Sequence, residues 1–200
     1  MFKLLGRLIT LVLVLIGLAT VVAAGSFAMG GISARQEPGR LETALAPKLR
    51  AMAIPASAKQ EKNPLPASPE VIAGGLEHFA DHCSICHGND GSGDTEMGRA
   101  MYPRVPDMRK PETQNLSDGE LFYIIQNGVR LTGMPAWAHE DANDNWKLVH
   151  FIRHQPKLTP QELAQMVSLN PKSHDEEAEA PAKPAPNPES KPHTHTHPHK

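Results

Sequence analysis

The stretch Cys83-Ser84-Ile85-Cys86-His87 contains the only two cysteines of the chain and places a histidine directly after the second one. On one helical turn, Cys83, Cys86 and His87 stand at positions i, i+3 and i+4, so their side chains share one face. Two thiols and one imidazole can therefore meet the same flat ligand. The segment predicts a binding site for such a ligand, built on a helix.

The spacing Cys-x-x-Cys-His is the attachment signature of c-type haem, in which two thiols add to the vinyl groups and the imidazole ligates the iron. A zinc site, a redox dithiol or a structural disulfide fits less well. Zinc would need further ligands at suitable spacing, and no third cysteine exists. A thioredoxin-like dithiol would lie in a βαβ pattern, whereas the neighbouring sequence is helical in character. We therefore predict one covalently attached haem c per chain, bonded to Cys83 and Cys86, with His87 as an iron ligand.

The composition indicates a small domain with long appendages. Of 200 residues only 4% are aromatic, while 19 are prolines, which crowd between Pro38 and Pro69 and again after Pro156. About ninety residues remain between these regions to build a core, and a covalently held haem would add apolar volume to it. The formal net charge of −2 gives no indication of a nucleic-acid partner.

The N-terminus predicts a membrane anchor. Lys3 and Arg7 precede an uncharged apolar run from Leu8 to Met29, which is long enough to span a bilayer as a helix. A cleaved signal peptide is the alternative, with Ser26 and Ala28 as a small-x-small site, but its apolar region would be unusually long. We expect a single pass through the inner (cytoplasmic) membrane, with the basic flank in the cytoplasm and the haem domain on the periplasmic side.

The chain divides into five predicted segments. They are a membrane anchor or signal peptide (1–29), a Pro/Ala-rich tether (30–67), the haem domain (68–156), a short additional helix (157–170) and a disordered acidic, Pro-rich and His-rich tail (171–200). As flexible coil the tether would have a reach of about 35 Å. One helical stretch is expected within it, near residues 41–52, and packing of the segment on the domain remains the alternative.

Several helix boundaries are marked by local signals. Ser68 is a predicted N-cap with Pro69 at the first helical position. Two further helices begin with capping boxes, at Ser117 with Glu120 and at Thr159 with Glu162. Asn127-Gly128 is a typical helix end. These signals predict an all-α fold.

The first and last helices of the haem domain are expected to cross. A helix predicted over about 143–155 presents an apolar stripe of Trp146, Val149 and Ile152. Gly75 and Phe79 lie on the same face of the first helix as Cys83. A small residue beside an aromatic one suits a close contact with the last helix.

Met134, in Gly133-Met134-Pro135-Ala136-Trp137, is the predicted sixth ligand of the haem iron. It follows a helix end and stands in a turn stiffened by proline, which suits presentation of a thioether from the face opposite His87. The competing methionines lack these flanking residues and lie nearer the motif: Met97, Met101 and Met108. A bis-histidine site with His139 or His150 is a further alternative.

The tail ends in four alternating histidines: His193, His195, His197 and His199. Imidazole suits divalent transition metals, and a flexible chain can fold two or three of these side chains onto one ion. We predict a weak metal site there, with a merely solvated polar tail as the alternative.

From about Glu70 to Gln155 the sequence resembles the class I monohaem cytochrome c family, in its small bacterial, oxidase-associated form. The shared elements are Gly75 and Phe79, the Cys-x-x-Cys-His motif, Asp90-Gly91-Ser92-Gly93, Ser117-Asp118-Gly119-Glu120-Leu121, Asn127-Gly128, Gly133-Met134-Pro135-Ala136-Trp137 and Trp146. The resemblance implies an all-α class I cytochrome c fold around one haem, with His87 and Met134 as axial ligands. It also implies a proline carbonyl, of Pro103 or Pro106, that accepts a hydrogen bond from the His87 imidazole.

The expected function is one-electron transfer by a membrane-anchored carrier rather than an enzyme. With both axial positions filled, iron changes charge without binding a substrate. Acidic residues outnumber basic ones between Glu70 and Arg153, so redox partner proteins with basic docking faces are expected. The alternatives are a haem enzyme or gas sensor with a labile sixth ligand, and a metal-handling protein that acts through its tail.

Overall fold

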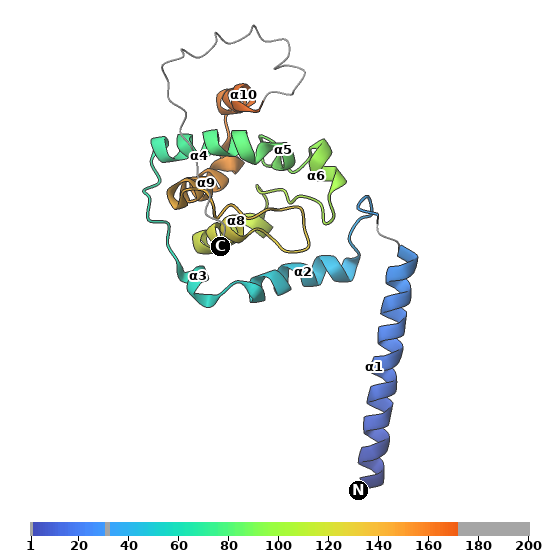
Figure 1. The fold of residues 1–200 in the computed structure, drawn as a ribbon. Coiled ribbons are helices and arrows are strands. Elements are labelled where there is room, and N and C mark those ends of the chain that lie inside the picture. The colour runs from blue at the N-terminus through green and yellow to red at the C-terminus, as the bar shows by residue number, and fades with distance from the viewer. Residues whose placement is uncertain (1, 31–32, 172–200) are drawn as a thin grey trace, which may run out of the picture. The chain divides into compact units, whose positions relative to one another are not determined.

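The computed structural model describes residues 2–30 and 33–171, and throughout these residues it contains helices and no strand (Figure 1). The chain divides into two units, Met1–Asn170 and Pro171–Lys200. The predicted all-α fold is confirmed for the described residues. Apart from Pro171, the predicted disordered tail lies outside them.

The helices follow one another along the chain as α1 (Phe2–Gly30), α2 (Arg40–Ala53), α3 (Ala56–Gln60), α4 (Pro69–His82), α5 (Ser84–His87), α6 (Glu96–Ala100), α7 (Pro111–Gln114), α8 (Asp118–Asn127), α9 (Ala142–His154) and α10 (Pro160–Leu169), with a 3₁₀ turn at Gln155–Lys157. The predicted helix starts are confirmed. The Ser68 hydroxyl accepts a hydrogen bond from the Val71 N–H at 3.3 Å, and both capping boxes are formed.

Helix α1 is long and apolar enough over Lys3–Ser26 to cross a membrane. Its side chains from Lys3 to Ser26 are exposed and pack against no other part of the described chain. A signal sequence can also meet this criterion of length and apolarity, so the helix itself agrees with either prediction for the N-terminus. An exposed helix that is apolar on all sides does need an apolar environment.

Helices α4 and α9 cross in direct contact at Gly75. A Cβ atom at Gly75 would collide with the carbonyl oxygen of Lys147 and lie 2.8 Å from the Cβ of Phe151. The rings of Phe79 and Phe151 are 5.1 Å apart, in a tilted arrangement. The expected crossing is therefore confirmed, and Gly75 is required by the closeness of the two backbones.

Gly75→Ala is expected to lower the free energy of unfolding by about 1–3 kcal/mol, because the added methyl group meets backbone that cannot move aside. Gly74→Ala is the matched control, since a Cβ there would meet only the flexible side chain of Lys147, at 3.1 Å. The control should stay within about 1 kcal/mol of the parent protein. Denaturant unfolding followed by circular dichroism measures both, and equal effects of the two variants would contradict the proposed crossing constraint.

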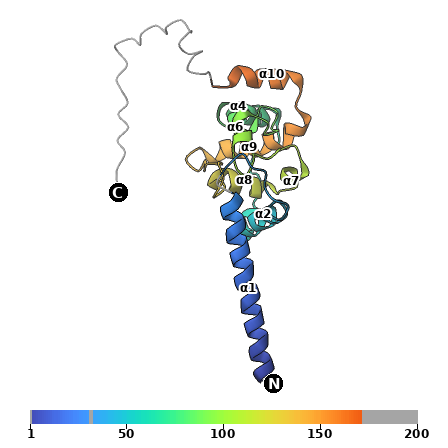
Figure 2. The ribbon, with the colours of Figure 1, turned by 90° about the vertical axis from the view of Figure 1, so that its right-hand side faces the viewer.

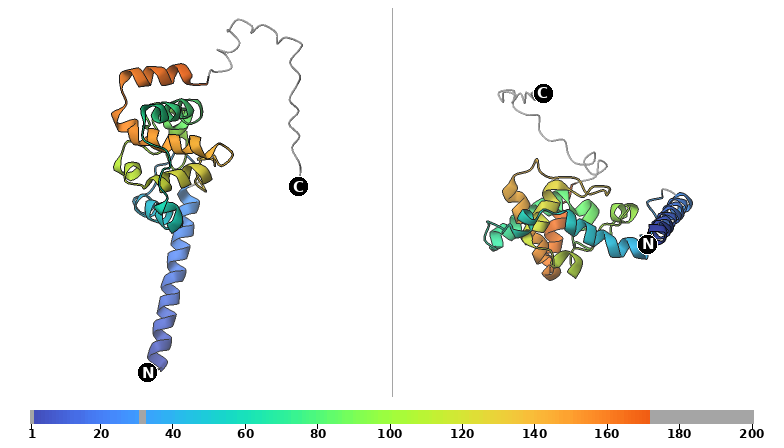
Figure 3. Two further views of the ribbon diagram at one scale, coloured as in Figure 1. Left: turned by 90° about the vertical axis from the view of Figure 1, so that its left-hand side faces the viewer. Right: turned by 90° about the horizontal axis from the view of Figure 1, so that it is seen from below.

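The core lies between α4, α8, α9 and α10. Its buried residues are Leu76, Phe79, Ala80, Met108, Leu121, Ile125, Trp146, Leu148, Val149, Phe151, Ile152 and Met166. Helix α10 lies beside α4, which it contacts, as Figures 2 and 3 show from other sides. Met166 is the buried residue of α10 and is fully inaccessible to solvent. The predicted additional helix therefore contributes to the core.

The segment predicted as a tether contains α2 and α3, and its second half packs on the domain. Ile54 and Leu65 contribute apolar surface to this packing. The Asn63 side chain donates a hydrogen bond to the Trp146 carbonyl at 3.0 Å, and the Ser117 hydroxyl donates one to the Lys59 carbonyl at 2.9 Å. A Pro- and Ala-rich composition predicts coil, but a few apolar side chains and backbone carbonyls suffice to dock residues 54–66. For these residues the alternative stated above, packing on the domain, is what the structure shows.

Candidate functional site

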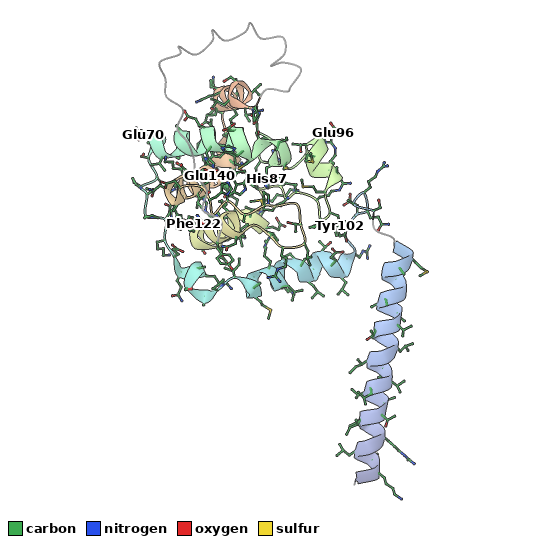
Figure 4. The ribbon with its side chains drawn as sticks, viewed as in Figure 1. Glu70, His87, Glu96, Tyr102, Phe122 and Glu140 are labelled. Atoms are coloured by element: carbon green, nitrogen blue, oxygen red, sulfur yellow. The ribbon has the colours of Figure 1, made fainter. Side chains whose placement is uncertain are left out.

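The three residues of the attachment motif stand on one helical turn. Cys83 forms the C-cap of α4, and α5 continues directly from it. The N–H groups of Cys86 and His87 both donate to the Cys83 carbonyl, at 3.2 and 3.0 Å. Figure 4 shows His87 below α4 and α5, on the side of these helices toward α8. The two thiols and the imidazole are thus held in a single rigid turn.

The His87 imidazole is buried, with 8% of the residue exposed. Its Nδ1 atom is fully buried and has no hydrogen-bond partner among the described residues. Neither Pro103 nor Pro106 accepts a hydrogen bond from it in this structure. Burial lowers the pKa of His87 to about 4, so the ring is neutral at neutral pH. A buried, neutral imidazole fits a metal ligand.

The two cysteines are free thiols. Burial, with a smaller contribution from nearby Cys86, raises the pKa of Cys83 to about 12, and burial also raises the pKa of Cys86. Redox-active dithiols instead depend on thiol pKa values that are lowered by helix ends or positive charge. The raised pKa values therefore do not fit a redox-active dithiol.

The turn after the motif packs its backbone tightly against the loop that follows. Gly93 has a φ of 72°, and its N–H donates to the His87 carbonyl at 2.8 Å. A Cβ there would lie 2.5 Å from the Val105 carbonyl oxygen. The Thr95 hydroxyl donates to the Cys86 carbonyl at 3.0 Å, which ties α6 to the motif. Residues 88–94 therefore form a tight turn between the motif and α6. Helix α6 was not predicted from the sequence.

Met134 stands in a loop whose backbone is held from two sides. Its carbonyl accepts from the Val129 N–H at 3.2 Å, and its N–H donates to the Thr132 hydroxyl at 3.1 Å. Gly128, the C-cap of α8 with a φ of 64°, lies so close that a Cβ would come within 2.6 Å of the Met134 carbonyl oxygen. The end of α8 therefore sets the position of the Met134 loop, and the Met134 side chain is half-buried.

The C-terminal end of this loop, at Trp137, forms hydrogen bonds with α8 and α9. The Trp137 N–H donates to the Ile125 carbonyl at 3.1 Å, and the Asn145 side chain donates to the Trp137 carbonyl at 3.0 Å. Asn145 is fully buried, and its Oδ1 atom has no partner among the described residues. Asn145 was not predicted from the sequence as a residue that supports the site. The only available signal was an asparagine beside the apolar stripe of an amphipathic helix.

The competing iron ligands have different surroundings. Met108 belongs to the core, and Met97 is 45% exposed. The sulfur of Met101 lies 2.6 Å from the position of a Cβ at Gly133, so Met101 contacts the turn that carries Met134.

The two histidine alternatives make other contacts. The His150 Nε2 atom is 2.9 Å from the Leu65 carbonyl oxygen, and exposed His139 pairs with Glu140 at 3.3 Å. Among these competitors, Met101 contacts Gly133, the neighbour of Met134 in the chain.

Two arginines organise the loops around the site. Arg153 of α9 donates to the carbonyls of Gln114 and Leu116 and to the carboxylate of Asp118. Arg109 pairs with Asp107 and Asp90, both at 2.9 Å. The hydrogen bond from Arg109 is the largest cause of the lowered pKa of Asp107. Neither arginine was predicted as an anchor, because their partners lie far away along the chain or within loops.

No group of three or more His, Cys, Asp or Glu side chains that could hold a metal ion occurs within residues 2–30 and 33–171. The four tail histidines (His193, His195, His197 and His199) lie outside the described residues. The tail metal site stays a prediction from sequence.

The chain matches a known protein family over the haem domain. Residues 70–152 match the family described as cytochrome C oxidase, cbb3-type, subunit III. The match begins within α4 and ends within α9, so it includes the motif turn, α8 and the Met134 loop. No curated protein matches the chain.

Proposed function

Because residues 70–152 form a class I c-type cytochrome domain, related to oxidase-associated cytochromes c and carrying covalently attached haem c, we propose that this protein carries single electrons between redox partners. The proposed axial ligands of the iron are His87 and Met134. The observation that carries the proposal is the buried, neutral His87 imidazole on the same helical turn as the sulfur atoms of Cys83 and Cys86.

The residues of this chain bind, orient and shield the haem. Cys83 and Cys86 hold it covalently, while α4 and α5 fix the direction of the His87 ring. When bound, the haem supplies an iron that alternates between Fe(II) and Fe(III). Phe79, whose ring is 6.2 Å from that of His87, contributes to an apolar surrounding that excludes water. A dry pocket and a thioether ligand both raise the reduction potential.

The absorption spectrum of the purified protein tests this proposal. A low-spin, six-coordinate haem with the weak band of a methionine–iron bond supports an electron carrier. A high-spin haem with an open position would contradict it and favour an enzyme or gas sensor, because such proteins leave room for a small molecule at the iron.

We also propose that α1 is retained as a membrane anchor, with the haem domain on the periplasmic side of the inner membrane. The support is a helix that is apolar and exposed over Lys3–Ser26, attached to a domain whose haem fits an extracytoplasmic location. The excess of acidic residues in that domain fits partners with basic faces.

The mature protein is expected to keep residues 8–29 and to stay in the membrane fraction through high-salt and carbonate washes. An apolar helix of this length inserts essentially irreversibly, unlike a peripheral electrostatic contact. Mass spectrometry of the mature N-terminus is the measurement. A soluble form that starts near Met29 would show that α1 is a signal peptide.

The four tail histidines are expected to bind Cu²⁺, Zn²⁺ or Ni²⁺ weakly, without changing the haem spectrum. Because neutral imidazole is the ligand, binding should fade as the pH falls through about 6.5. Calorimetry on the intact protein and on a form truncated after Ser190 measures this. The prediction is wrong if both forms bind equally or neither binds.

A further inference from the structure

Helix α2 presents a stripe of apolar side chains to solvent. The stripe consists of Leu41, Leu45, Leu49 and Met52, whose spacing places them on one face of the helix. Their exposed fractions are 72%, 43%, 61% and 80%. Helix α2 contains no buried residue. A continuous exposed apolar stripe indicates a surface that another apolar phase or partner covers.

The stripe faces away from the haem domain. Arg50 and Ala51, the half-buried residues of α2, stand on the opposite side of the helix, as does Ile54, which is buried just beyond its end. The docking contacts are polar. The Tyr102 hydroxyl donates to Glu42 at 2.5 Å, and Arg104 pairs with Glu37 at 2.6 Å. Helix α2 is thus held against the domain while its apolar stripe remains uncovered.

The chain itself indicates what covers this stripe. Residues 31–39 connect α1 to α2, and even fully extended they reach only about 35 Å. If α1 spans a bilayer, α2 therefore begins close to the surface of that bilayer.

The charges of α2 also suit such a surface. Helix α2 carries two exposed basic residues, Arg40 and Lys48, against the single acid Glu42, which is already engaged by Tyr102. An apolar stripe with basic side chains is the composition of helices that lie in the interface of anionic membranes.

We propose that α2 lies in the surface of the same bilayer that holds α1, with its stripe among the acyl chains and the exposed Arg40 and Lys48 at anionic headgroups. This inference rests on the proposed retention of α1. Through Glu37 and Glu42, α2 then carries the loop at Tyr102 and Arg104, so the haem domain is held at a defined height above the membrane. A second copy of the chain or a redox partner on the stripe are the competing occupants.

Photo-crosslinking of the full chain tests the proposal. The protein is placed in vesicles of phosphatidylethanolamine and phosphatidylglycerol, with a diazirine amino acid at Leu45 in one sample and at Thr43 in another. Thr43 is also exposed but stands on the other side of α2, so it is the matched control. A third sample carries the probe at Val14 of α1. We expect lipid adducts at position 45 at least about five-fold above position 43.

The outcomes separate the two proposals. Strong lipid adducts at position 14 with equally low adducts at positions 43 and 45 would overturn the role of α2 and leave the anchor intact. Protein adducts in place of lipid adducts at position 45 would overturn it in favour of a second copy or a partner. An absence of lipid adducts at position 14 would overturn the anchor, and the role of α2 with it.

Discussion

Met134→Ala is expected to leave the haem covalently attached but to convert the iron from six-coordinate low spin to high spin. Attachment needs only the thiols of Cys83 and Cys86, whereas the thioether of Met134 is the proposed sixth ligand of the iron. Carbon monoxide should bind the variant at least about 100-fold more tightly, since it no longer competes with an internal ligand worth a few kcal/mol. The reduction potential should fall as well. Absorption spectra, carbon monoxide titration and potentiometry measure these changes.

Met101→Ala is the matched control for this experiment. The Met101 sulfur lies against Gly133, directly beside the Met134 turn, but Met101 lacks the backbone hydrogen bonds and the flanking proline that place Met134. The Met101 variant should keep the low-spin spectrum of the parent protein. If it opens the iron while the Met134 variant does not, the sixth ligand is Met101.

Arg153→Ala is expected to lower the free energy of unfolding by about 2–4 kcal/mol, the largest stability effect proposed for this domain. The guanidinium donates to two backbone carbonyls, of Gln114 and Leu116, and to the Asp118 carboxylate at the start of α8. Its removal leaves these acceptors partly buried and without their donor. Denaturant unfolding of the holoprotein, followed by circular dichroism and haem absorbance, measures the loss.

Arg109→Ala serves as the comparison for Arg153. Arg109 also bridges two loops, through Asp107 and Asp90, but its side chain is 39% exposed. Ion pairs at such positions contribute about 0–1 kcal/mol. Equal destabilisation by the two substitutions would show that Arg153 is not the anchor of α8.

The helices could be predicted from the sequence because their signals are local. Ser117 and Glu120 lie within one turn of each other, so the capping box is visible in the sequence and forms as expected. The crossing at Gly75 and Phe79 was also predictable, since one face of a helix can be deduced from spacing alone. In contrast, α6 and α7 have only 5 and 4 residues, too few for a periodic pattern to identify them.

The anchors of the Met134 loop could not be predicted, because they depend on how separate helices and loops pack together. The contact between Asn145 and the Trp137 carbonyl depends on how closely α9 passes the loop after α8. The hydrogen bond between Asn63 and the Trp146 carbonyl depends in the same way on the path of the segment before α4. An asparagine side chain can pair with any nearby backbone group, so its identity does not reveal its partner.

By itself, the sequence determined the chemistry of this protein: two thiols and an imidazole on one helical turn, which local backbone geometry brings to the same face. Only the tertiary structure decided whether the segment before the domain packs on the domain or remains flexible coil. Its second half is docked because Asn63 and Lys59 pair with Trp146 and Ser117, much later in the chain. Helix α2 is held by the hydrogen bond from Tyr102 to Glu42, while its apolar stripe stays exposed. Burial depends on which distant surfaces come together, and no local pattern of residues records that.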